Sequence, residues 1–388
     1  MTANRDVWSV VTFGSVVRQI RDVVDPVADD VERFVAGEHM ESGQLTIRKW
    51  GLVKDTDLGP AFYRRFRPGH VLYGSRRPYL RKVARADFAG VCADKTFVVE
   101  SANPQELLPE FLPLAMMAET FHAHSITWSR GSINPYVNWS DVAKYEFRLP
   151  QLSEQQRIAG LMWAFEETVL AKRSALEAAQ KAEVSALVEL YDEPAWPVRR
   201  VDEAGDVQLG QGLSSQTRSG GRSRPYLRVA NVGDDELFLD DVRAMTFDET
   251  GFTKYQLRDG DVLLNEGQSL EYVGRSAIYR SELSDCCFQN SLLRFRSSGD
   301  ILPEFAHGWF RRCLHMGQFA RVAKRTTSLA HLSAGLLSSQ PIPVPPKADQ
   351  QRVVDRLAAA RELRQTLEQG LEETRTLMSR TLNAVLNG

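Results

Sequence analysis

Two long stretches of the chain, near residues 153–190 and 349–386, have the most regular spacing of apolar residues. Apolar side chains recur there every three or four positions, which is the period of one face of an α-helix. No proline interrupts either stretch. The pattern predicts two helices of about 37 residues, roughly 55 Å long at 1.5 Å per residue. Ser153 and Gln156 form a capping-box pattern at the first helix, and Asp349 is the expected cap of the second.

The apolar faces of these helices need a partner, because an isolated helix is only marginally stable in water. The simplest partners are each other, so we predict an antiparallel coiled coil. The residues expected to pair the helices are Ile158, Leu161, Phe165, Leu176, Val353, Leu357, Leu367 and Leu371.

The segments outside the two helices have a different pattern. Short β-branched and aromatic runs alternate with turn residues, as in residues 70–73 (HVLY) before Gly74 and residues 96–99 (TFVV) before Asn103. A short helix is expected over residues 109–122. This mixture predicts α+β domains with irregular loops.

The chain also contains a long internal repeat. Residues 108–111 (LPEF) recur at 302–305, and residues 155–157 (QQR) recur at 350–352, so the offsets are 194 and 195. Cys92 falls opposite Cys287, and Trp8 opposite Trp196. Offsets that stay between 188 and 195 over half the chain indicate a tandem repeat with small loop insertions. The sequence RPYLR at residues 77–81 and 224–228 has an offset of 147, so we interpret it as a coincidence.

Each repeat therefore consists of a mixed domain followed by a long helix. We predict four segments, which are a first domain at 1–150, a central helix at 151–191, a second domain at 192–345 and a C-terminal helix at 346–388. Paired antiparallel helices would form a stiff spacer between two domains. Two such domains suit a bipartite DNA site, and because most of their residues differ, the site would be asymmetric.

Charge is distributed unevenly along the chain. The 388 residues have a net charge of −2, which is not that of a protein that simply coats DNA. Three stretches nevertheless contain basic residues and no acid. They run from Arg64 to Arg85, over the segment that holds Arg218, Arg222, Arg224 and Arg228, and from Phe305 to Ala348. Local basic surface binds phosphate whatever the total charge, so these stretches are candidate contacts to nucleic acid.

Several kinds of active site lack their sequence signals. Residues 134–136 (NPY) lack the second proline of the loop that adenine methyltransferases use, and no glycine-rich loop for S-adenosylmethionine follows a strand. No Walker A lysine loop is present. Asp234, Asp235, Asp240 and Asp241 are expected to form a solvated turn. We therefore expect no catalytic site on this chain.

The cysteines and histidines indicate no metal site. Cys92, Cys286, Cys287 and Cys313 have neither CxxC spacing nor a disulfide framework, so packed thiols are expected. His122 and His124 are close in sequence but lack further ligands nearby, which favours a structural pair. Residues 1–11 lack the profile of a signal peptide, and no run of apolar residues is long enough to span a membrane. A cytoplasmic protein is expected.

Several segments together resemble the specificity subunits of type I restriction–modification systems over the whole chain. In the first half they are residues 66–82, 131–139 and 149–158. In the second half they are residues 260–267, 273–275, 287–290 and 322–327.

The resemblance implies two target-recognition domains, binding to double-stranded DNA, and a complex with two methyltransferase subunits and two restriction–translocase subunits. S-adenosylmethionine, ATP and Mg are expected on the partner subunits, and no cofactor on this chain. The candidate DNA-binding residues are Arg64, Arg65, Arg67, Arg76, Arg77, Tyr79, Arg81, Lys82, Arg222, Arg224, Arg228, Lys324, Arg325, Thr326 and Thr327. Two alternatives stay open, namely a fused DNA adenine methyltransferase, which would bind the cofactor alone, and a coiled-coil scaffold that binds only protein.

Overall fold

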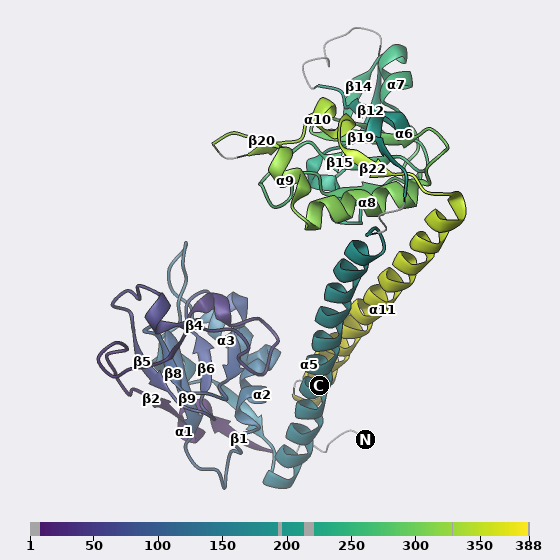
Figure 1. The fold of residues 1–388 in the computed structure, drawn as a ribbon. Helices are drawn as coiled ribbons and strands as arrows, with labels where there is room; N and C mark the ends of the chain where they lie inside the picture. The colour runs from purple at the N-terminus through teal and green to yellow at the C-terminus, as the bar shows by residue number, and fades with distance from the viewer. Residues whose placement is uncertain (1–7, 193–195, 213–220, 328, 387–388) are drawn as a thin grey trace. The chain divides into compact units, whose positions relative to one another are not determined.

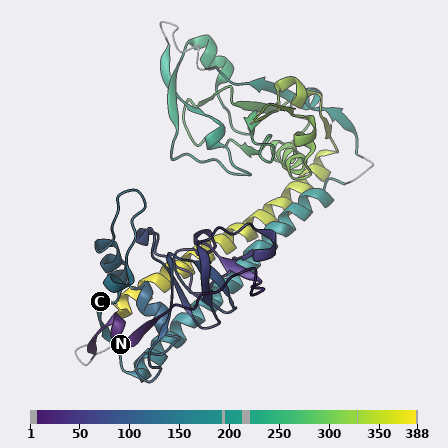
Figure 2. The same ribbon diagram turned by 90° about the vertical axis from the view of Figure 1, so that its left-hand side faces the viewer.

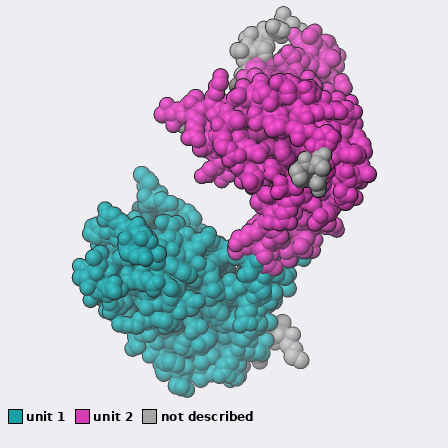
Figure 3. Space-filling model, in the orientation of Figure 1, with its two compact units in different colours: residues 1–174, 368–388 teal, residues 175–367 magenta. Residues whose placement is uncertain are grey.

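The computed structural model describes residues 8–192, 196–212, 221–327 and 329–386. The chain divides into two compact units (Figure 3). Unit 1 contains residues 1–174 and 368–388, and unit 2 contains residues 175–367. Two long helices, α5 (Leu152–Glu189) and α11 (Lys347–Leu386), contribute residues to both units.

Unit 1 is built on a four-stranded antiparallel sheet with the order β2-β9-β6-β7. Its strands are β2 (Val17–Ile20), β9 (Thr96–Ser101), β6 (Val71–Gly74) and β7 (Val83–Arg85). Both faces of the sheet are covered, because successive side chains of a strand point to opposite faces. Val71 and Tyr73 belong to the core beneath the helices, whereas Leu72 belongs to the core shared with a second sheet. Burial on both faces explains why residues 70–73 are continuously apolar rather than alternating.

The second sheet of unit 1 has the order β4-β3-β8-β5, and β3 runs parallel to β8. Its strands are β4 (Gly51–Leu52), β3 (Arg33–Val35), β8 (Gly90–Ala93) and β5 (Phe62–Phe66). A separate two-stranded ribbon joins β1 (Ser9–Thr12) to β10 (Glu146–Leu149), directly before α5. The short helices are α1 (Phe13–Val16), α2 (Leu112–Met117), α3 (Glu119–Thr127) and α4 (Trp139–Val142). The helix expected over residues 109–122 is thus two helices, because Ala118 is extended between them.

Unit 2 repeats this arrangement. Its four-stranded sheet has the order β12-β19-β15-β17, from β12 (Gly205–Leu209), β19 (Leu292–Ser297), β15 (Val262–Asn265) and β17 (Ser276–Ile278). A second sheet has the order β14-β13-β18, from β14 (Arg243–Phe247), β13 (Arg222–Leu227) and β18 (Cys287–Phe288). The ribbon before α11 joins β11 (Val198–Arg200) to β22 (Pro341–Pro343). The helices are α6 (Val201–Ala204), α7 (Glu249–Tyr255), α8 (Pro303–His315), α9 (Gln318–Val322) and α10 (Ala334–Ser338).

A buried glutamine at the start of each long helix shows most directly that the repeat is structural. The Gln155 side chain accepts a hydrogen bond from Leu108 N and donates to the carbonyls of Glu106 and Pro150. Gln350 does the same with Leu302 N and the carbonyls of Asp300 and Pro345. Both side chains are fully buried. The repeated LPEF and QQR motifs are therefore the two ends of one latch, which ties each domain to its helix, and the predicted tandem repeat is confirmed.

The RPYLR motif has two unrelated structures. Residues 78–80 form a 3-10 turn between Arg77 and Arg81, whose φ values are both 52°. Residues 224–227 lie in strand β13 instead. The interpretation of this second match as a coincidence is confirmed.

The two long helices run side by side and antiparallel within each unit (Figures 1 and 2). In unit 1, Lys172 Nζ donates to Gly370 O at 2.8 Å and to Thr374 Oγ1 at 2.9 Å. In unit 2, Arg364 Nε donates to the Glu183 carboxylate at 2.9 Å. Residue numbers thus rise on α5 where they fall on α11, and the predicted antiparallel pair is confirmed.

The residues expected to pair the helices are unequally buried. Ile158, Val353, Leu357 and Leu371 are buried, Phe165, Leu176 and Leu367 are half-buried, and Leu161 is 40% exposed. Met162 is buried beside Leu161. The expected cap at Ser153 is wrong, since α5 begins at Leu152 and the Gln151 carbonyl accepts from Glu154 N. Likewise α11 begins at Lys347, so Asp349 lies inside the helix.

Candidate nucleic-acid interface

An exposed hairpin of unit 1 joins several polar side chains that lie far apart in the sequence. Tyr136 pairs with Arg130 and with Arg76 through backbone bridges, so three short segments lie side by side. Arg77 N donates to Pro135 O at 2.6 Å, and Arg77 Nε donates to Asn134 Oδ1 at 2.9 Å. Gly131 has a φ of +94°, which explains why a glycine begins this turn.

A cavity of about 250 Å³ lies beside this hairpin. Its lining includes the cations Arg21, Arg64 and Lys95, and one acid, Asp94. The Lys95 ammonium lies 5.8 Å from the centre of the Tyr136 ring. Cations next to an exposed aromatic ring are suited to phosphate and base contacts.

The structure separates the basic residues of unit 1 that the sequence grouped together. Arg64 lines the cavity, and Arg76 and Arg77 are exposed at the hairpin. Arg81, in contrast, donates to both carboxylate oxygens of Glu119 at 2.6 Å. The remaining candidates are Arg65, half-buried on β5, Arg67, which pairs with Asp22, Tyr79, which is exposed, and Lys82, which donates to Gly37 O.

Unit 2 has an equivalent hairpin made of β20 (Lys324–Arg325) and β21 (Ala330–His331), with β16 (Gly267–Gln268) beside it. β20 lies on a loop that projects from the rest of the unit (Figure 1). The candidates Lys324, Arg325, Thr326 and Thr327 are all exposed there. His331 takes the position of Tyr136, and its Nδ1 lies 3.2 Å from a Glu266 carboxylate oxygen.

The three other candidates of unit 2 lie on or next to β13. Arg224 pairs with Asp285, and its guanidinium lies 4.0 Å from the centre of the Phe252 ring. Arg228 pairs with Asp241. Arg222 is exposed, and Arg218 lies outside the described residues. The acids that pair with these arginines come from other parts of the chain, so a sequence window without acids could not reveal them.

Sequence reasoning missed Arg21, Lys95 and Arg130 as members of this surface. None of them lies in one of the acid-free basic stretches. The alignment of the two halves contains the signal, because Arg130 falls opposite Lys324 at the repeat offset of 194.

The sequence predicts neither a metal site nor a reactive thiol, and the described residues can be examined for both. Within them, no group of three or more His, Cys, Asp or Glu side chains could hold a metal ion. Burial raises the pKa of Cys92, Cys286, Cys287 and Cys313 to about 12, so these thiols stay protonated near neutral pH. His124 Nε2 lies 2.8 Å from Asp141 O, and its neighbour His122 is buried apart from it. Across the described ranges, no helix is long and apolar enough to cross a bilayer.

The expected solvated turn at Asp234 and Asp235 is wrong. The Asp235 side chain is only 2% exposed, and it pairs with Arg311 at 3.3 Å and with Arg361. Asp234 accepts from Arg311 at 2.8 Å and from His315 at 2.9 Å. Burial would raise the pKa of Asp234, but the hydrogen bonds from His315 and Arg311 outweigh it and hold that pKa below its ordinary value. Both aspartates thus belong to one ion network, in which the Asp235 side chain is buried and that of Asp234 is half-buried.

Comparison with known proteins finds a domain match in the second half of the chain. Residues 195–374 match the family model "Type I restriction modification DNA specificity domain". The chain is 24% identical over 182 residues to the type I restriction enzyme EcoKI specificity subunit of Escherichia coli strain K12, and 27% identical over 157 residues to the EcoDI specificity subunit of Escherichia coli. These matches cover 46% and 39% of this chain. They cover 39% and 33% of the relatives, so the chain spans well under half the length of the curated relatives it matches.

Two solved structures share the fold over nearly the whole chain. One is a chain from a study of complex assembly and conformational transition of the type I R-M system, with a TM-score of 0.63 and 22% identity over 98% of this chain and 96% of that one. The other is the type I restriction-modification system S subunit from M. genitalium, with a TM-score of 0.59 and 13% identity over 100% and 98% of the two chains. Both share the α+β tandem fold.

Proposed function

We propose that the chain is a specificity subunit of a type I restriction–modification system, since residues 195–374 match the DNA specificity domain of that family. In this role it reads a bipartite, asymmetric DNA site for a methyltransferase and endonuclease complex. Unit 1 reads one half-site and unit 2 reads the other. The chain directs the partner subunits to the site and performs no chemistry itself.

The pair of equivalent hairpins is the observation that carries this proposal. Each hairpin is exposed, basic, and held beside the main sheet of its own unit. Their side chains differ, with arginine, asparagine and tyrosine in unit 1 and lysine, arginine and threonine in unit 2. Arginine suits guanine edges and asparagine suits adenine edges, whereas threonine contacts several bases. Two scaffolds of one kind with different contact residues would read two different half-sites.

The roles of the partner subunits follow from the same proposal. Two methyltransferase subunits and two restriction–translocase subunits bind the chain in the cytoplasm, and they hold S-adenosylmethionine, ATP and Mg. The exposed surfaces of α5 and α11 are the places on this chain for helical partners.

Mapping of methylated bases in cells that carry this subunit and its partners tests the proposal. A bipartite motif with two different halves is expected. Grafting residues 130–136 from a related subunit should change one half of the motif and leave the other half intact. A single continuous motif, or a graft that alters both halves, would contradict the proposal.

A further inference from the structure

A buried ion network closes the junction between the domain and the long helices in unit 2. The Arg311 guanidinium, on α8, contacts Glu183 of α5 at 2.8 Å, Asp234 at 2.8 Å and Asp235 at 3.3 Å. Arg361 and Arg364 of α11 complete it, with Asp235 and Glu183 as their partners. The cations of this junction thus come from α8 and α11, and the acids come from α5 and the loop at residues 234–235.

Unit 1 has the same junction with different side chains. The LPEF offset of 194 places Met117 opposite Arg311, and the glutamine offset of 195 places Met378 opposite Glu183 and Glu166 opposite Arg361. Gly43 falls opposite Asp235 at the offset of 192 that also relates the 3-10 turns Gly37–His39 and Val229–Asn231, and both residues have a positive φ, 77° and 70°. Unit 1 therefore lacks both the guanidinium of Arg311 and the carboxylates that surround it.

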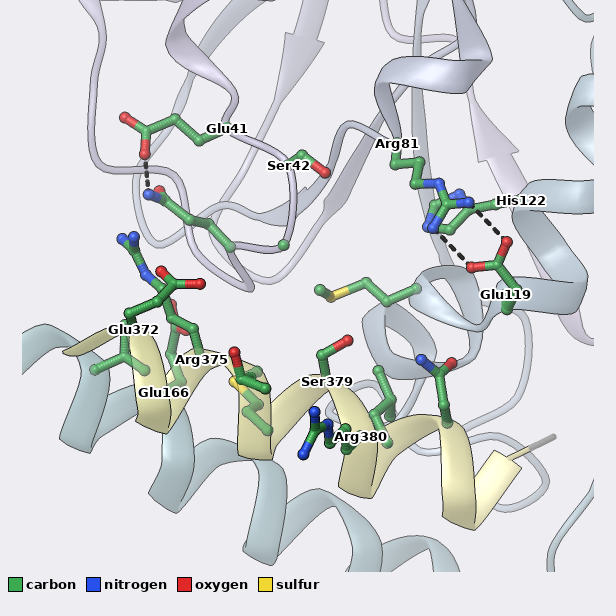
Figure 4. Close-up of a pocket in the computed structure, with 18 residues that line it drawn as sticks. Glu41, Ser42, Arg81, Glu119, His122, Glu166, Glu372, Arg375, Ser379 and Arg380 are labelled. Atoms are coloured by element: carbon green, nitrogen blue, oxygen red, sulfur yellow. Dashed lines mark hydrogen bonds and ion pairs between the residues drawn. The ribbon is translucent and has the colours of Figure 1, made fainter. Parts of the chain in front are cut away.

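These replacements leave a cavity of about 540 Å³ (Figure 4). The loop with Glu41 and Ser42 lies on one side, and Arg375, Ser379 and Arg380 of α11 lie on another (Figure 4). The volume falls in the range of roughly 300–1,000 Å³ that small-molecule sites occupy.

Glu166 is the buried carboxylate of this cavity that lacks a counter-ion among the described residues, whereas Glu372, which also lines the cavity, is exposed. Its side chain is only 3% exposed, and Thr46 Oγ1, at 2.8 Å, is the single hydrogen-bond donor to it among the described residues. A buried carboxylate with one hydroxyl partner is costly, because loss of hydration is not offset by an opposite charge. A cation placed in the cavity would supply that charge.

The other charged groups of the cavity divide into paired and available ones. Glu41 is held by Lys49 and Arg173, whose hydrogen bonds lower its pKa to about 2. Arg81 and Glu119 hold each other. In the described part of the chain, Arg375 and Arg380 form no ion pair, so they remain available to the anionic end of a ligand.

His122 adds a neutral polar group to the lining. It is 4% exposed, and its Nδ1 has no hydrogen-bond partner within the described ranges. Burial, with Arg81 acting in the same direction and Glu119 against it, lowers the pKa of His122 to about 4. The ring is therefore uncharged at neutral pH and does not repel a cation.

We propose that the unit 1 cavity binds a guanidinium-bearing ligand, with Glu166 as the counter-ion of the guanidinium and Arg375 and Arg380 facing an anionic group of the ligand. Guanidinium fits this role because it can form two parallel hydrogen bonds with a carboxylate. In unit 2, moreover, the guanidinium of Arg311 lies at the equivalent junction. The ligand is a free small molecule or an arginine side chain of a protein. The site goes beyond DNA reading, and in the described part of unit 2 Arg311 fills the equivalent junction.

Calorimetric titration of the full chain with L-arginine, L-citrulline and the tripeptide Gly-Arg-Gly tests the proposal. Citrulline is the uncharged analogue of arginine, so it should bind roughly tenfold more weakly or worse, and Glu166→Gln should weaken arginine by a similar factor. Glu166→Gln keeps the acceptor for Thr46, so the fold should be retained. Tighter binding of the tripeptide than of free arginine indicates a protein source, and equal binding indicates a free small molecule.

A second experiment introduces the guanidinium as a side chain of the protein. Met117→Arg should fill the cavity, abolish arginine binding and raise Tm by about 2–4 °C, and that rise should vanish in the Glu166→Gln background. Met117→Leu is the matched control, with little change in Tm expected. Equal binding of arginine and citrulline, together with the same Tm change for Met117→Arg in both backgrounds, would overturn the proposal.

Discussion

Unit 1 and unit 2 place different residues at equivalent points of one scaffold. At the hairpins, Tyr136 in unit 1 corresponds to His331 in unit 2. At the junction with the long helices, Met117 corresponds to Arg311. The junction of unit 1 contains a cavity, whereas charged side chains fill that of unit 2. The latches formed by Gln155 and Gln350, in contrast, have the same three hydrogen bonds.

The difference between the latches and the hairpins follows from burial. A fully buried glutamine must satisfy its own polar atoms and those around it, so any replacement leaves several unpaired groups. Exposed hairpin residues contact solvent and can change without such a loss. The repeat therefore separates a fixed attachment of domain to helix from a variable surface, which is the division that reading two half-sites requires.

The largest expected effect concerns the junctions. Arg311→Met gives unit 2 the residue of unit 1 and leaves Glu183, Asp234 and Asp235 without their shared cation. We expect a loss of about 3–5 kcal/mol of unfolding free energy, as when one partner of a buried ion pair is removed. Met117→Leu, the matched change in unit 1, should cost less than about 1.5 kcal/mol. Urea denaturation measures both, and equal losses would show that the network does not stabilise unit 2.

The latches should behave alike, in contrast to the junctions. Gln155→Leu and Gln350→Leu each remove three hydrogen bonds and leave a buried N–H and two carbonyls unpaired. A cost of about 2–3 kcal/mol is expected for each. Because the contacts are equivalent, the two costs should agree within about 0.5 kcal/mol. A loss in only one of the two variants would argue against a common role.

A buried neutral histidine in each unit predicts a common dependence on pH. Burial lowers the pKa of His122 and of His307 to about 4, from an ordinary value of 6.5. Between pH 6.5 and 4 the unfolded chain thus binds more protons than the folded one, so stability falls as the pH falls. About 1–2 kcal/mol per histidine should be lost between pH 6.5 and 5. Denaturation at pH 7, 6 and 5 measures this slope, which His122→Phe should reduce. An unchanged slope in that variant would assign the dependence to other groups.

The sequence predicted the parts of the fold that depend on periodicity. Apolar residues at helical spacing and the ordered offsets of LPEF and QQR were sufficient for two antiparallel helices and a tandem repeat. The exposure of Leu161 was not predictable in this way. The helix instead buries Met162 and, four residues later on the same face, the charged Glu166. The four-segment division at residues 150, 191 and 345 stays a prediction.

The candidate interface was less predictable, because ion pairs join residues that are distant in sequence. Arg224 and Asp285 are 61 residues apart, and Arg81 and Glu119 are 38 apart. A basic stretch without acids therefore overestimates the free positive charge. Of the residues chosen from such stretches, those at the two hairpins remain exposed. Lys95 and Arg130 join them from elsewhere, and these two are paired with Asp94 and Asp141.

Under the proposed function, hairpin variants should alter only one half-site each. Asn134→Ala in unit 1 removes an amide that suits adenine, and Arg325→Ala in unit 2 removes a guanidinium that suits guanine. Each should reduce discrimination by about 1–2 kcal/mol at one half-site and leave the other unchanged. Competition binding with DNA altered in either half measures this. Loss of discrimination at both halves from one variant would show that the hairpins do not act separately.

The smallest effect distinguishes free from paired cations. Arg76 and Lys324 are exposed and form no ion pair among the described residues, whereas Arg81 is bound to both oxygens of Glu119. A phosphate contact by Arg76 or Lys324 would release about one counterion, so Arg76→Gln and Lys324→Gln should each reduce the slope of log K against log salt by about one. Arg81→Gln should reduce it less, because Glu119 already neutralises that charge. Affinity should fall by less than about 1 kcal/mol and equally for every sequence, since phosphates do not differ between sites. Equal slopes for all three variants would mean that ion pairing within unit 1 does not decide which cations contact DNA.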